Sequence, residues 1–326
     1  MKAIVQDVYG SVDVLEMREI DRPSPADGEV LVRVSAAGVG PDVWHLMMGL
    51  PFLVRLVFGL RKPKNPVRGA DGAGWVEAVG AKVSGFAPGD AVYGQFEGSF
   101  AEYAVAKAAR IAPKPENLSF AQAAAAPVSG LTALQALHAK AGLRAGQKVL
   151  VIGASGGVGS FAVQLATAHG ADVTAVCGAG AAEFVRTLGA TDVIDYTREE
   201  ITARDRRYDI VLDAAGNRPV SLLRRVLTPS GTLVRVGGEG GNRWFADLGT
   251  HLWMVLLSRF VRQNLRGHFS AVRQRDLLTL KTLSEKGHIV PAVDSTYPLA
   301  EAAAAVRHLK EGHPRGKVVL IVTPGA

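Results

Sequence analysis

Two patterns of hydrophobic and polar positions divide the chain. Up to about residue 113, short runs alternate apolar and polar residues or stay apolar, with glycine and proline turn signals between them. The runs that predict β-strands are 2–6, 14–19, 29–37, 74–79 and 100–105. From Ser119 the periodicity becomes helical, and Gln122 stands three residues after Ser119, the spacing of a capping box at a helix start. A β-rich part is therefore expected to precede a part that begins with helices, the second of them at 131–141.

Strands and helices are expected to alternate from residue 147 onward. The predicted strands are 149–152, 172–176, 192–195, 210–214 and 232–236, and the predicted helices between them are 158–169, 181–188 and 220–227. Short apolar strands separated by helices of this size indicate a parallel sheet covered on both faces. Two further helices, at 275–286 and 300–310, and a strand at 317–322 are expected to close the chain.

The composition narrows the class of protein. The chain has 326 residues, 48% of them hydrophobic and 21% charged, which excludes a disordered chain and suggests about two domains. Its single cysteine, Cys177, excludes an internal disulfide framework and a multi-cysteine metal site. The net charge is +7, but the basic residues are scattered and not interleaved with aromatic residues, so we expect no nucleic-acid partner.

The apolar runs are too short for a membrane span. The longest, 46–60 and 252–261, are interrupted by glycine, proline or arginine, and a span needs roughly 18 apolar residues. The first residues form a strand-like run with an early acid rather than a signal peptide. We therefore expect no transmembrane span and a cytoplasmic protein.

A glycine-rich turn is the strongest chemical motif. An apolar strand runs into Gly153, Gly156, Gly157 and Gly159, and a predicted helix follows at once. Such glycines let the chain turn tightly and let a pyrophosphate approach the N-terminus of the helix, where N–H groups and the helix dipole favour negative charge. No Gly-Lys-Ser/Thr follows, so the turn is not a P-loop. The sequence therefore predicts a dinucleotide site.

The end of the second strand of this region bears on the choice of dinucleotide. NAD sites usually carry an acid there, which hydrogen-bonds the ribose hydroxyls. The strand at 172–176 is followed instead by Cys177, Gly178, Ala179 and Gly180, whose small size leaves room for a 2′-phosphate. NADPH is therefore favoured; because no Lys or Arg stands directly beside these residues, NADH stays open.

The glycine spacing also fits short-chain dehydrogenases, which need a Tyr-x-x-x-Lys pair downstream. The tyrosines after the turn are followed four residues later by Glu200, Leu212 and Glu301. Tyr103 and Lys107 have the spacing but precede the turn and lie in a strand pattern. The short-chain interpretation therefore lacks its catalytic pair.

Eight segments together resemble one superfamily; they are 36–45, 69–74, 88–94, 98–103, 127–133, 153–159, 188–196 and 315–320. The chain resembles the medium-chain dehydrogenase/reductase superfamily, and within it the zinc-lacking, zeta-crystallin-like quinone oxidoreductase branch. The resemblance implies an α/β fold with two domains. A β-rich GroES-like catalytic domain would comprise 1–122 and 272–326, and a Rossmann domain with a doubly wound parallel sheet would comprise 123–271. A homodimer is the expected assembly.

The resemblance also implies an activity. It is hydride transfer from NADPH to a hydrophobic quinone or an α,β-unsaturated carbonyl (an enone or enal), in a cleft between the domains and without zinc. Zinc-binding members carry Gly-His-Glu where this chain has Gly69, Ala70 and Asp71, and a ligand cysteine near the position of Gly40. Two alternatives stay open: a 2-enoyl-thioester reductase of the same superfamily, and a cofactor-binding protein with little turnover.

By the same resemblance, cofactor contacts fall on several short segments. Thr132 would lie beside the nicotinamide, and Lys317 would close the site from the C-terminal segment. The remaining residues would hold the pyrophosphate, face the adenosine ribose or its 2′-phosphate, or pass over the cofactor: Ser155, Gly156, Gly157 and Val158; Cys177, Gly178 and Tyr196; Gly216, Asn217, Gly237 and Gly238. The chain departs from the branch at Gly40, where an asparagine is usual, and at Gly180 and Ala181, where the family's residues for the 2′-phosphate fall.

The substrate pocket is expected near a Trp-His pair. Trp44, Leu46 and Phe52 are its candidate residues, and His45 is the candidate proton donor because its ordinary pKa lies near neutrality. A packed or surface role for His45 fits the sequence equally well. The segment 50–64 is apolar with basic flanks, so it is either a lid over a hydrophobic substrate or an interfacial contact with a membrane.

Overall fold

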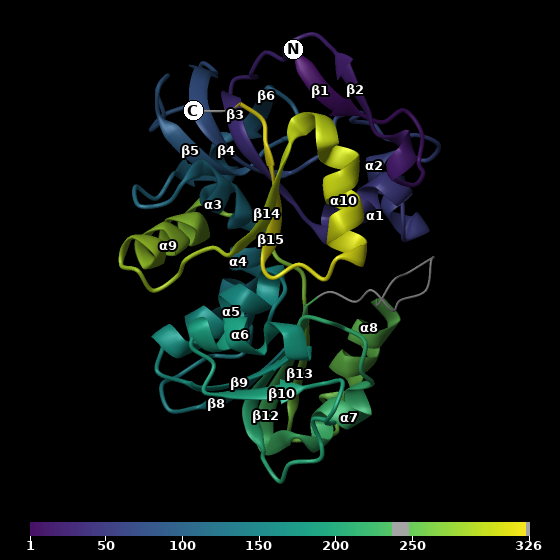
Figure 1. Ribbon diagram of the computed structural model, residues 1–326, viewed down its shortest axis with the longest axis vertical. Helices are drawn as coiled ribbons and strands as arrows, with labels where there is room; N and C mark the ends of the chain where they lie inside the picture. The colour runs from purple at the N-terminus through teal and green to yellow at the C-terminus, as the bar shows by residue number, and fades with distance from the viewer. Residues whose placement is uncertain (237–247, 324–326) are drawn as a thin grey trace. The chain divides into compact units, whose positions relative to one another are not determined.

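The computed structural model describes residues 1–236 and 248–323, and the chain divides into two compact units (Figure 1). Unit 1 comprises Met1–Leu131 and Val272–Ala326, and unit 2 comprises Thr132–Ala271. The first boundary lies nine residues beyond the expected position of 122, because helix α3 (Phe120–Ala125) packs on strands of unit 1. A Cβ at Gly38 of the central strand would lie 2.6 Å from the carbonyl oxygen of Ala124, which shows how closely α3 approaches.

A seven-stranded sheet forms the centre of unit 1. Its strand order is β14-β15-β3-β4-β5-β7, and β6 pairs with β3. The C-terminal strand β15 pairs antiparallel with β3, so the two distant pieces of the chain share one sheet. The strands are β3 (Glu29–Val39), β4 (Asp71–Val79), β5 (Ala91–Gln95), β6 (Tyr103–Lys107), β7 (Ile111–Pro113), β14 (Val293–Pro298) and β15 (Lys317–Ile321), with a separate hairpin of β1 (Lys2–Val5) and β2 (Glu16–Glu19).

The first helix after residue 113 begins where the sequence predicts it, at Ser119. Ser119 Oγ accepts a hydrogen bond from the N–H of Gln122, and Gln122 Oε1 accepts one from the N–H of Ser119, which confirms the predicted capping box. The helices are α1 (Pro41–Met48), α2 (Arg55–Phe58), α3, α4 (Pro127–Leu134, which crosses into unit 2), α9 (Gln274–Glu285) and α10 (Ala302–Glu311), with short 3₁₀ helices η1 (Val12–Val14), η2 (Phe52–Val54), η3 (Ala108–Arg110) and η6 (Leu299–Glu301).

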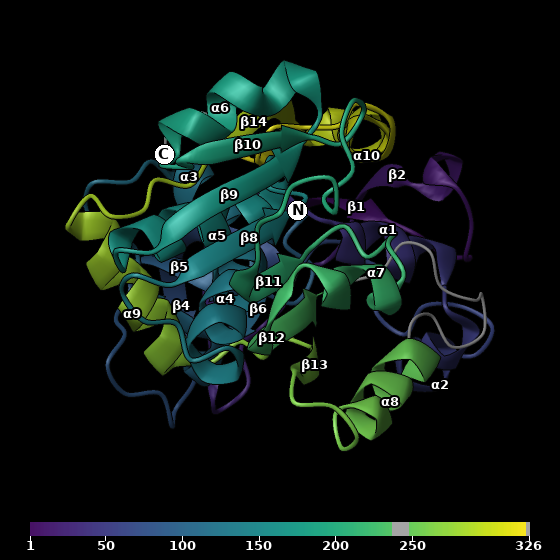
Figure 2. The ribbon, with the colours of Figure 1, turned by 90° about the horizontal axis from the view of Figure 1, so that it is seen from below.

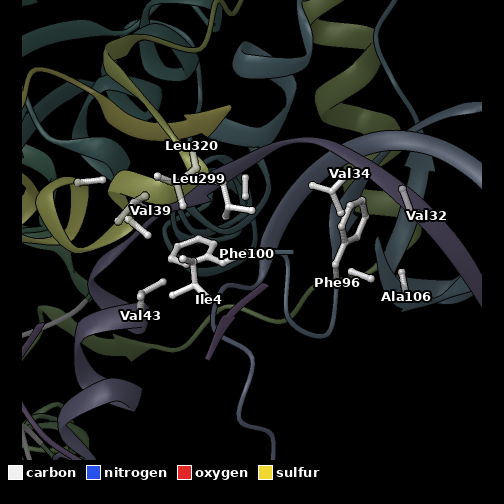
Figure 3. Packing of buried hydrophobic residues seen from close by; sticks show 14 of the residues in the cluster. Ile4, Val32, Val34, Val39, Val43, Phe96, Phe100, Ala106, Leu299 and Leu320 are labelled. Carbon is white, nitrogen blue, oxygen red and sulfur yellow. The ribbon is translucent and has the colours of Figure 1, made fainter. Parts of the chain in front are cut away.

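The core of unit 1 gathers around two phenylalanines (Figure 3). Phe100 lies among Ile4, Val39 and Leu320, which come from three different strands, and Phe96 lies near Val34. All six side chains are at most 3% exposed. Burying a side chain of this size stabilises a fold by about 1.5–3 kcal/mol. This cluster therefore joins the N-terminal strand, the central strand and the C-terminal strand into one body.

Unit 2 is a parallel six-stranded sheet (Figure 2). Its order, β10-β9-β8-β11-β12-β13, is the doubly wound order of a Rossmann fold, as expected. Strand β13 was not predicted, because its Asn, Arg, Gly and His residues interrupt the hydrophobic pattern. The strands are β8 (Lys148–Ile152), β9 (Asp172–Cys177), β10 (Asp192–Asp195), β11 (Tyr208–Asp213), β12 (Leu227–Val236) and β13 (Asn264–His268).

The helices of unit 2 are α5 (Gly157–Ala168), α6 (Ala182–Thr187), α7 (Val220–Arg225) and α8 (Leu248–Leu257), with a π-helical stretch η4 (Gln135–Lys140) and a 3₁₀ helix η5 (Ala179–Ala181). Helix α5 is buried along most of its length, which suits a helix that follows the glycine turn and packs on the sheet. Among the residues that the structure describes, no helix is long and apolar enough to cross a membrane.

Candidate functional site

The glycine turn joins β8 to α5 in unit 2. Gly153 has a φ of +76°, a left-handed conformation that favours glycine, and its N–H bonds to the carbonyl of Val176 on β9 at 3.1 Å. A Cβ on Gly159 would collide with the carbonyl oxygen of Gly153 and lie 2.7 Å from the Cα of Ala154. Glycine at position 159 is therefore needed for α5 to start directly against the turn.

Gly156 has a different role in the same turn. Its backbone is extended, with φ −78° and ψ −179°, and a Cβ there would meet only the carbonyl oxygen of Gly153, at 3.6 Å. Alanine at position 156 would therefore not collide with any protein atom. Its methyl group would instead occupy the space in front of the α5 N-terminus. The first N–H groups of a helix lack partners within the helix and attract anions. Ser155, Gly156, Gly157 and Val158 lie together at this N-terminus, and their contact with a pyrophosphate stays a prediction.

The ends of β9 and β10 bring three other predicted residues together. Cys177 is buried, and burial raises the pKa of its thiol. The N–H of Tyr196 bonds to the carbonyl of Cys177 at 3.2 Å, and the Tyr196 hydroxyl lies 3.6 Å from the position that a Cβ on Gly178 would take. The small residues at this strand end thus border a tyrosine ring rather than an acid of their own strand.

An acid does stand on the neighbouring strand, and the sequence analysis did not single it out. Asp195 is the register partner of Cys177. Its carboxylate accepts hydrogen bonds from the Thr197 hydroxyl at 2.8 Å and the Thr197 N–H at 3.0 Å, which lower its pKa, and it forms an ion pair with Arg198 at 3.5 Å. This carboxylate is therefore engaged by the turn that follows its own strand.

A buried ion pair fixes the loop after β11. Asp213 and Arg235 are register partners on β11 and β12, and their side chains pair with 3.7 Å between Oδ2 and Nε. Asp213 Oδ1 accepts a hydrogen bond from the N–H of Gly216 at 2.9 Å, while Arg235 donates to the Gly216 carbonyl. Burial raises the pKa of Asp213, and the Gly216 N–H and Arg235 oppose that rise. The sequence does not predict this ion pair, because its two residues lie 22 positions apart in the chain.

The same loop borders an open hollow of unit 2. The hollow has a volume of about 740 Å³, and its lining includes Gly216, Asn217, Arg218, Arg235 and Trp253. Two of the predicted cofactor residues, Gly216 and Asn217, therefore face a solvent-accessible space. Gly237 and Gly238, predicted to pass over the cofactor, lie outside the described residues.

A second charged group is buried in unit 1. Lys317 on β15 and Asp71 on β4 lie on either side of the central strand β3, and Lys317 Nζ is 3.5 Å from Asp71 Oδ2. Both side chains are at most 4% exposed. Burial raises the pKa of Asp71 to about 7, against the opposing effects of Lys317 and of the hydrogen bond from the N–H of Val128. Lys317, predicted as a cofactor contact, is thus already held by a carboxylate; Thr132 is likewise buried, in α4.

Gly40, near which the resemblance places the ligand cysteine of zinc-binding members, lies beside this charged group. A Cβ at Gly40 would collide with the Asp42 carboxylate and lie 3.2 Å from Lys317 Nζ. An ammonium at that place disfavours a divalent cation, and zinc prefers nitrogen and sulfur ligands in a tetrahedral array. Within residues 1–236 and 248–323, no group of three or more His, Cys, Asp or Glu side chains could hold a metal ion. These residues do not fit a zinc site.

The candidate substrate residues lie on α1 and η2 of unit 1. Trp44 packs against the core, and Lys310 Nζ lies 3.8 Å from the centre of its ring, which gives it the contacts of a packing residue. His45 and Leu46 are half-buried in the last turns of α1, and the Phe52 ring lies 4.8 Å from the Arg55 guanidinium. A substrate or proton-transfer role for these four residues stays a prediction.

Comparisons with known proteins agree with this geometry. The zinc-binding dehydrogenase family matches residues 188–320, and the alcohol dehydrogenase GroES-like domain matches residues 26–116. A chloroplast envelope quinone oxidoreductase homolog from Arabidopsis thaliana is 33% identical, over 98% of both chains. A 2-methylene-furan-3-one reductase from Solanum lycopersicum is 32% identical over 99% of this chain and 80% of its own.

A solved structure supports the same assignment. The quinone oxidoreductase from Coxiella burnetii superposes with a TM-score of 0.86 and 28% identity, over 99% of both chains. The full-length matches, the GroES-like match and the doubly wound sheet all point the same way. The chain belongs to the medium-chain dehydrogenase/reductase superfamily, in its quinone oxidoreductase branch.

Proposed function

We propose that this protein is an NADPH-dependent reductase that transfers hydride to a quinone or an α,β-unsaturated carbonyl without zinc. The observation that carries the proposal is the glycine turn between β8 and α5, followed by an end of β9 that holds Cys177 and Gly178 instead of an acid. The turn fits a pyrophosphate, and the small residues leave room for the 2′-phosphate that distinguishes NADPH.

In this proposal, residues of the chain bind the cofactor and fix the loop beside it. The N–H groups at the start of α5 hold the pyrophosphate, and the Asp213–Arg235 pair fixes the Gly216 loop through hydrogen bonds to its N–H and its carbonyl. The bound nicotinamide supplies a hydride. Because the residues at Gly40 and Asp71 do not fit zinc, positioning of the two reactants has to supply the acceleration that a Lewis acid would otherwise give.

The substrate class rests on the relatives. One is named a quinone oxidoreductase homolog and another a 2-methylene-furan-3-one reductase. Quinones and methylene furanones share a carbonyl conjugated with a carbon–carbon double bond, which accepts a hydride and places the resulting negative charge on oxygen. This shared chemistry favours a conjugated carbonyl over an isolated alcohol as the substrate.

Consumption of NADPH tests the proposed reaction. The purified protein is assayed with 9,10-phenanthrenequinone, 1,4-benzoquinone, trans-2-hexenal and crotonyl-CoA, each with and without prior chelation, and its zinc content is measured by elemental analysis. We expect turnover of a quinone or of the enal that chelation leaves unchanged. Turnover of crotonyl-CoA alone would support the enoyl-thioester alternative. Tight NADPH binding without any turnover would overturn the proposed enzymatic activity. Stoichiometric zinc would overturn the zinc-independent mechanism.

Gly178→Asp is expected to reverse the cofactor preference. Gly178 has φ −78° and ψ 159°, so a side chain is compatible with its backbone, and its Cβ would find space beside the Tyr196 hydroxyl. A carboxylate here repels a 2′-phosphate and accepts hydrogen bonds from ribose hydroxyls. We expect the Kd for NADPH to rise about tenfold or more, while that for NADH stays equal or falls. Gly178→Asn, which has the same size without the charge, is the control and should change the ratio much less; equal effects of both variants would contradict the electrostatic explanation.

A further inference from the structure

The segment Pro51–Lys64 of unit 1 presents large apolar side chains to solvent. Helix α2 follows α1 along the chain (Figure 1). The 3₁₀ helix η2 runs directly into α2, since Val54 and Arg55 at their junction both have right-handed helical backbones. Five side chains of this segment are 42–67% exposed and are named here the apolar tip: Leu53, Leu56, Val57, Phe58 and Leu60. Leu53, Leu56 and Val57 have the i, i+3, i+4 spacing that places them on one face.

The backbone beneath the apolar tip is tied down by hydrogen bonds. Arg55 points inward, where its Nε donates to the Gly49 carbonyl at 2.9 Å and its guanidinium stacks over the Tyr9 ring at 4.4 Å. The Tyr9 hydroxyl donates to the Gly59 carbonyl at 2.6 Å, and the N–H of Lys64 bonds to the carbonyl of Phe58 at 2.8 Å. The apolar tip is therefore held outward by its own segment, and little ordering remains to be done when it binds something.

Three cations flank the apolar tip. Arg61, Lys62 and Lys64 are exposed, and none of them forms an ion pair with an acid within the part of the chain that the structure describes. No acidic residue occurs anywhere between Asp42 and Asp71. These three residues are named here the basic flank, and they give this surface a positive charge that nothing in its own segment neutralises.

We infer that the apolar tip and the basic flank dock the protein on the surface of a membrane that contains anionic phospholipids. Apolar side chains of an interfacial helix enter the boundary between headgroups and acyl chains, while adjacent Lys and Arg side chains meet the lipid phosphates. A second copy of this chain fits less well, because pairing the same surface about a two-fold axis would bring two basic flanks together. The docking is independent of the proposed reaction, and its readout is lipid binding rather than turnover.

Sedimentation with lipid vesicles tests the inference on the full chain. Vesicles of phosphatidylcholine alone are compared with vesicles that also contain phosphatidylserine, at low and at high salt. We expect binding to the anionic vesicles only, and we expect it to weaken as salt rises because the attraction is screened. Equal binding to both kinds of vesicle, or binding to neither, overturns the inference.

Matched variants locate the contact on this segment. Arg61→Gln/Lys62→Gln/Lys64→Gln removes the basic flank, and each cation near an anionic surface is worth about fivefold in affinity, so the loss is roughly a hundredfold at low salt. The control, Lys107→Gln/Arg144→Gln/Lys286→Gln, removes the same charge from exposed positions elsewhere and should lose less than about fivefold. An equal loss in both variants would show only an effect of net charge and would overturn the inference.

The apolar contribution has its own pair of variants. Leu56→Ser/Val57→Ser should weaken vesicle binding about tenfold or more, since both side chains leave water when the helical turn is inserted. Leu278→Ser/Val290→Ser removes two aliphatic side chains, 42% and 49% exposed, from another part of unit 1 and should leave binding unchanged. Far-ultraviolet circular dichroism and thermal unfolding check that all variants fold. If Leu56→Ser/Val57→Ser instead converts a dimer into monomers in analytical ultracentrifugation and leaves vesicle binding unchanged, the surface contacts a second copy and the inference is wrong.

Discussion

Gly159→Ala should destabilise unit 2 and abolish cofactor binding, whereas Gly156→Ala should weaken cofactor binding without destabilising the fold. The Cβ at position 159 would collide with the Gly153 carbonyl oxygen and lie 2.7 Å from the Ala154 Cα. Both are backbone atoms, so neither can move without displacing α5 from the end of β8. Overpacking of this kind costs up to about 3 kcal/mol, which lowers the Tm by about 5–10 °C.

Gly156 lies three residues away and provides the contrast. A Cβ at position 156 would approach only the Gly153 carbonyl oxygen, at 3.6 Å, and the backbone there is extended, so alanine introduces no strain. Alanine also reduces the freedom of the unfolded chain, so the Tm should be equal or slightly higher. Its methyl group would nevertheless stand where the pyrophosphate must approach the helix, and we expect NADPH affinity to fall by about 10- to 100-fold.

Thermal unfolding and NADPH titration of the two variants therefore separate a packing glycine from a binding glycine. Ser155→Ala is the reference variant, because serine already carries a Cβ and the substitution adds no atom at that position. Its Tm should stay close to that of the unchanged chain. Two results would contradict the assignment of the turn: a Gly156→Ala variant that binds NADPH normally, or a Gly159→Ala variant that keeps its Tm.

The features predicted most accurately from the sequence are those that depend on residues close together in the chain. The capping box at Ser119 and Gln122 needs only three residues' separation, and the structure forms both of its hydrogen bonds. The strand at Asp192–Asp195 was predicted with its observed bounds, because its β-branched Val-Ile pair stands between aspartates. The glycine turn could be found because the strand before it and the helix after it have different periodicities.

What the sequence could not predict depends on residues brought together by topology. Asp213 and Arg235 meet only because β11 and β12 are neighbours in register, and Lys317 reaches Asp71 only because β15 pairs with β3 beside β4. The helix at Pro41–Met48 was not predicted as a helix. Its tryptophan and histidine were interpreted instead as candidate substrate contacts. Without a structure, Trp44 could not be seen to pack beneath Lys310.

Lys317→Met should destabilise the protein strongly above neutral pH and less in mild acid. Asp71 is fully enclosed, and burial already raises its pKa to about 7 while Lys317 holds it down. Without the ammonium, the pKa of Asp71 must rise further. The folded variant then keeps its proton at pH values where the unfolded chain has released it, so stability is highest in acid and is lost as the pH rises from about 4 through the folded-state pKa.

The size of this loss follows from the missing partner. Leaving one charge of a buried ion pair uncompensated costs about 3–5 kcal/mol, and we expect a loss of that size in urea unfolding at about pH 8.5. At about pH 5.5 the Asp71 carboxyl is neutral with or without Lys317, and the loss should be smaller by about 2 kcal/mol, because each pH unit between the pKa of about 7 and pH 8.5 contributes about 1.4 kcal/mol. Asp71→Asn/Lys317→Met removes both charges and is the matched control; its stability should differ little between the two pH values and return to within about 1 kcal/mol of the unchanged chain. If the single variant is equally unstable at both pH values, the cost comes from lost packing of the lysine stem, and the charge of Asp71 is not what Lys317 holds in place.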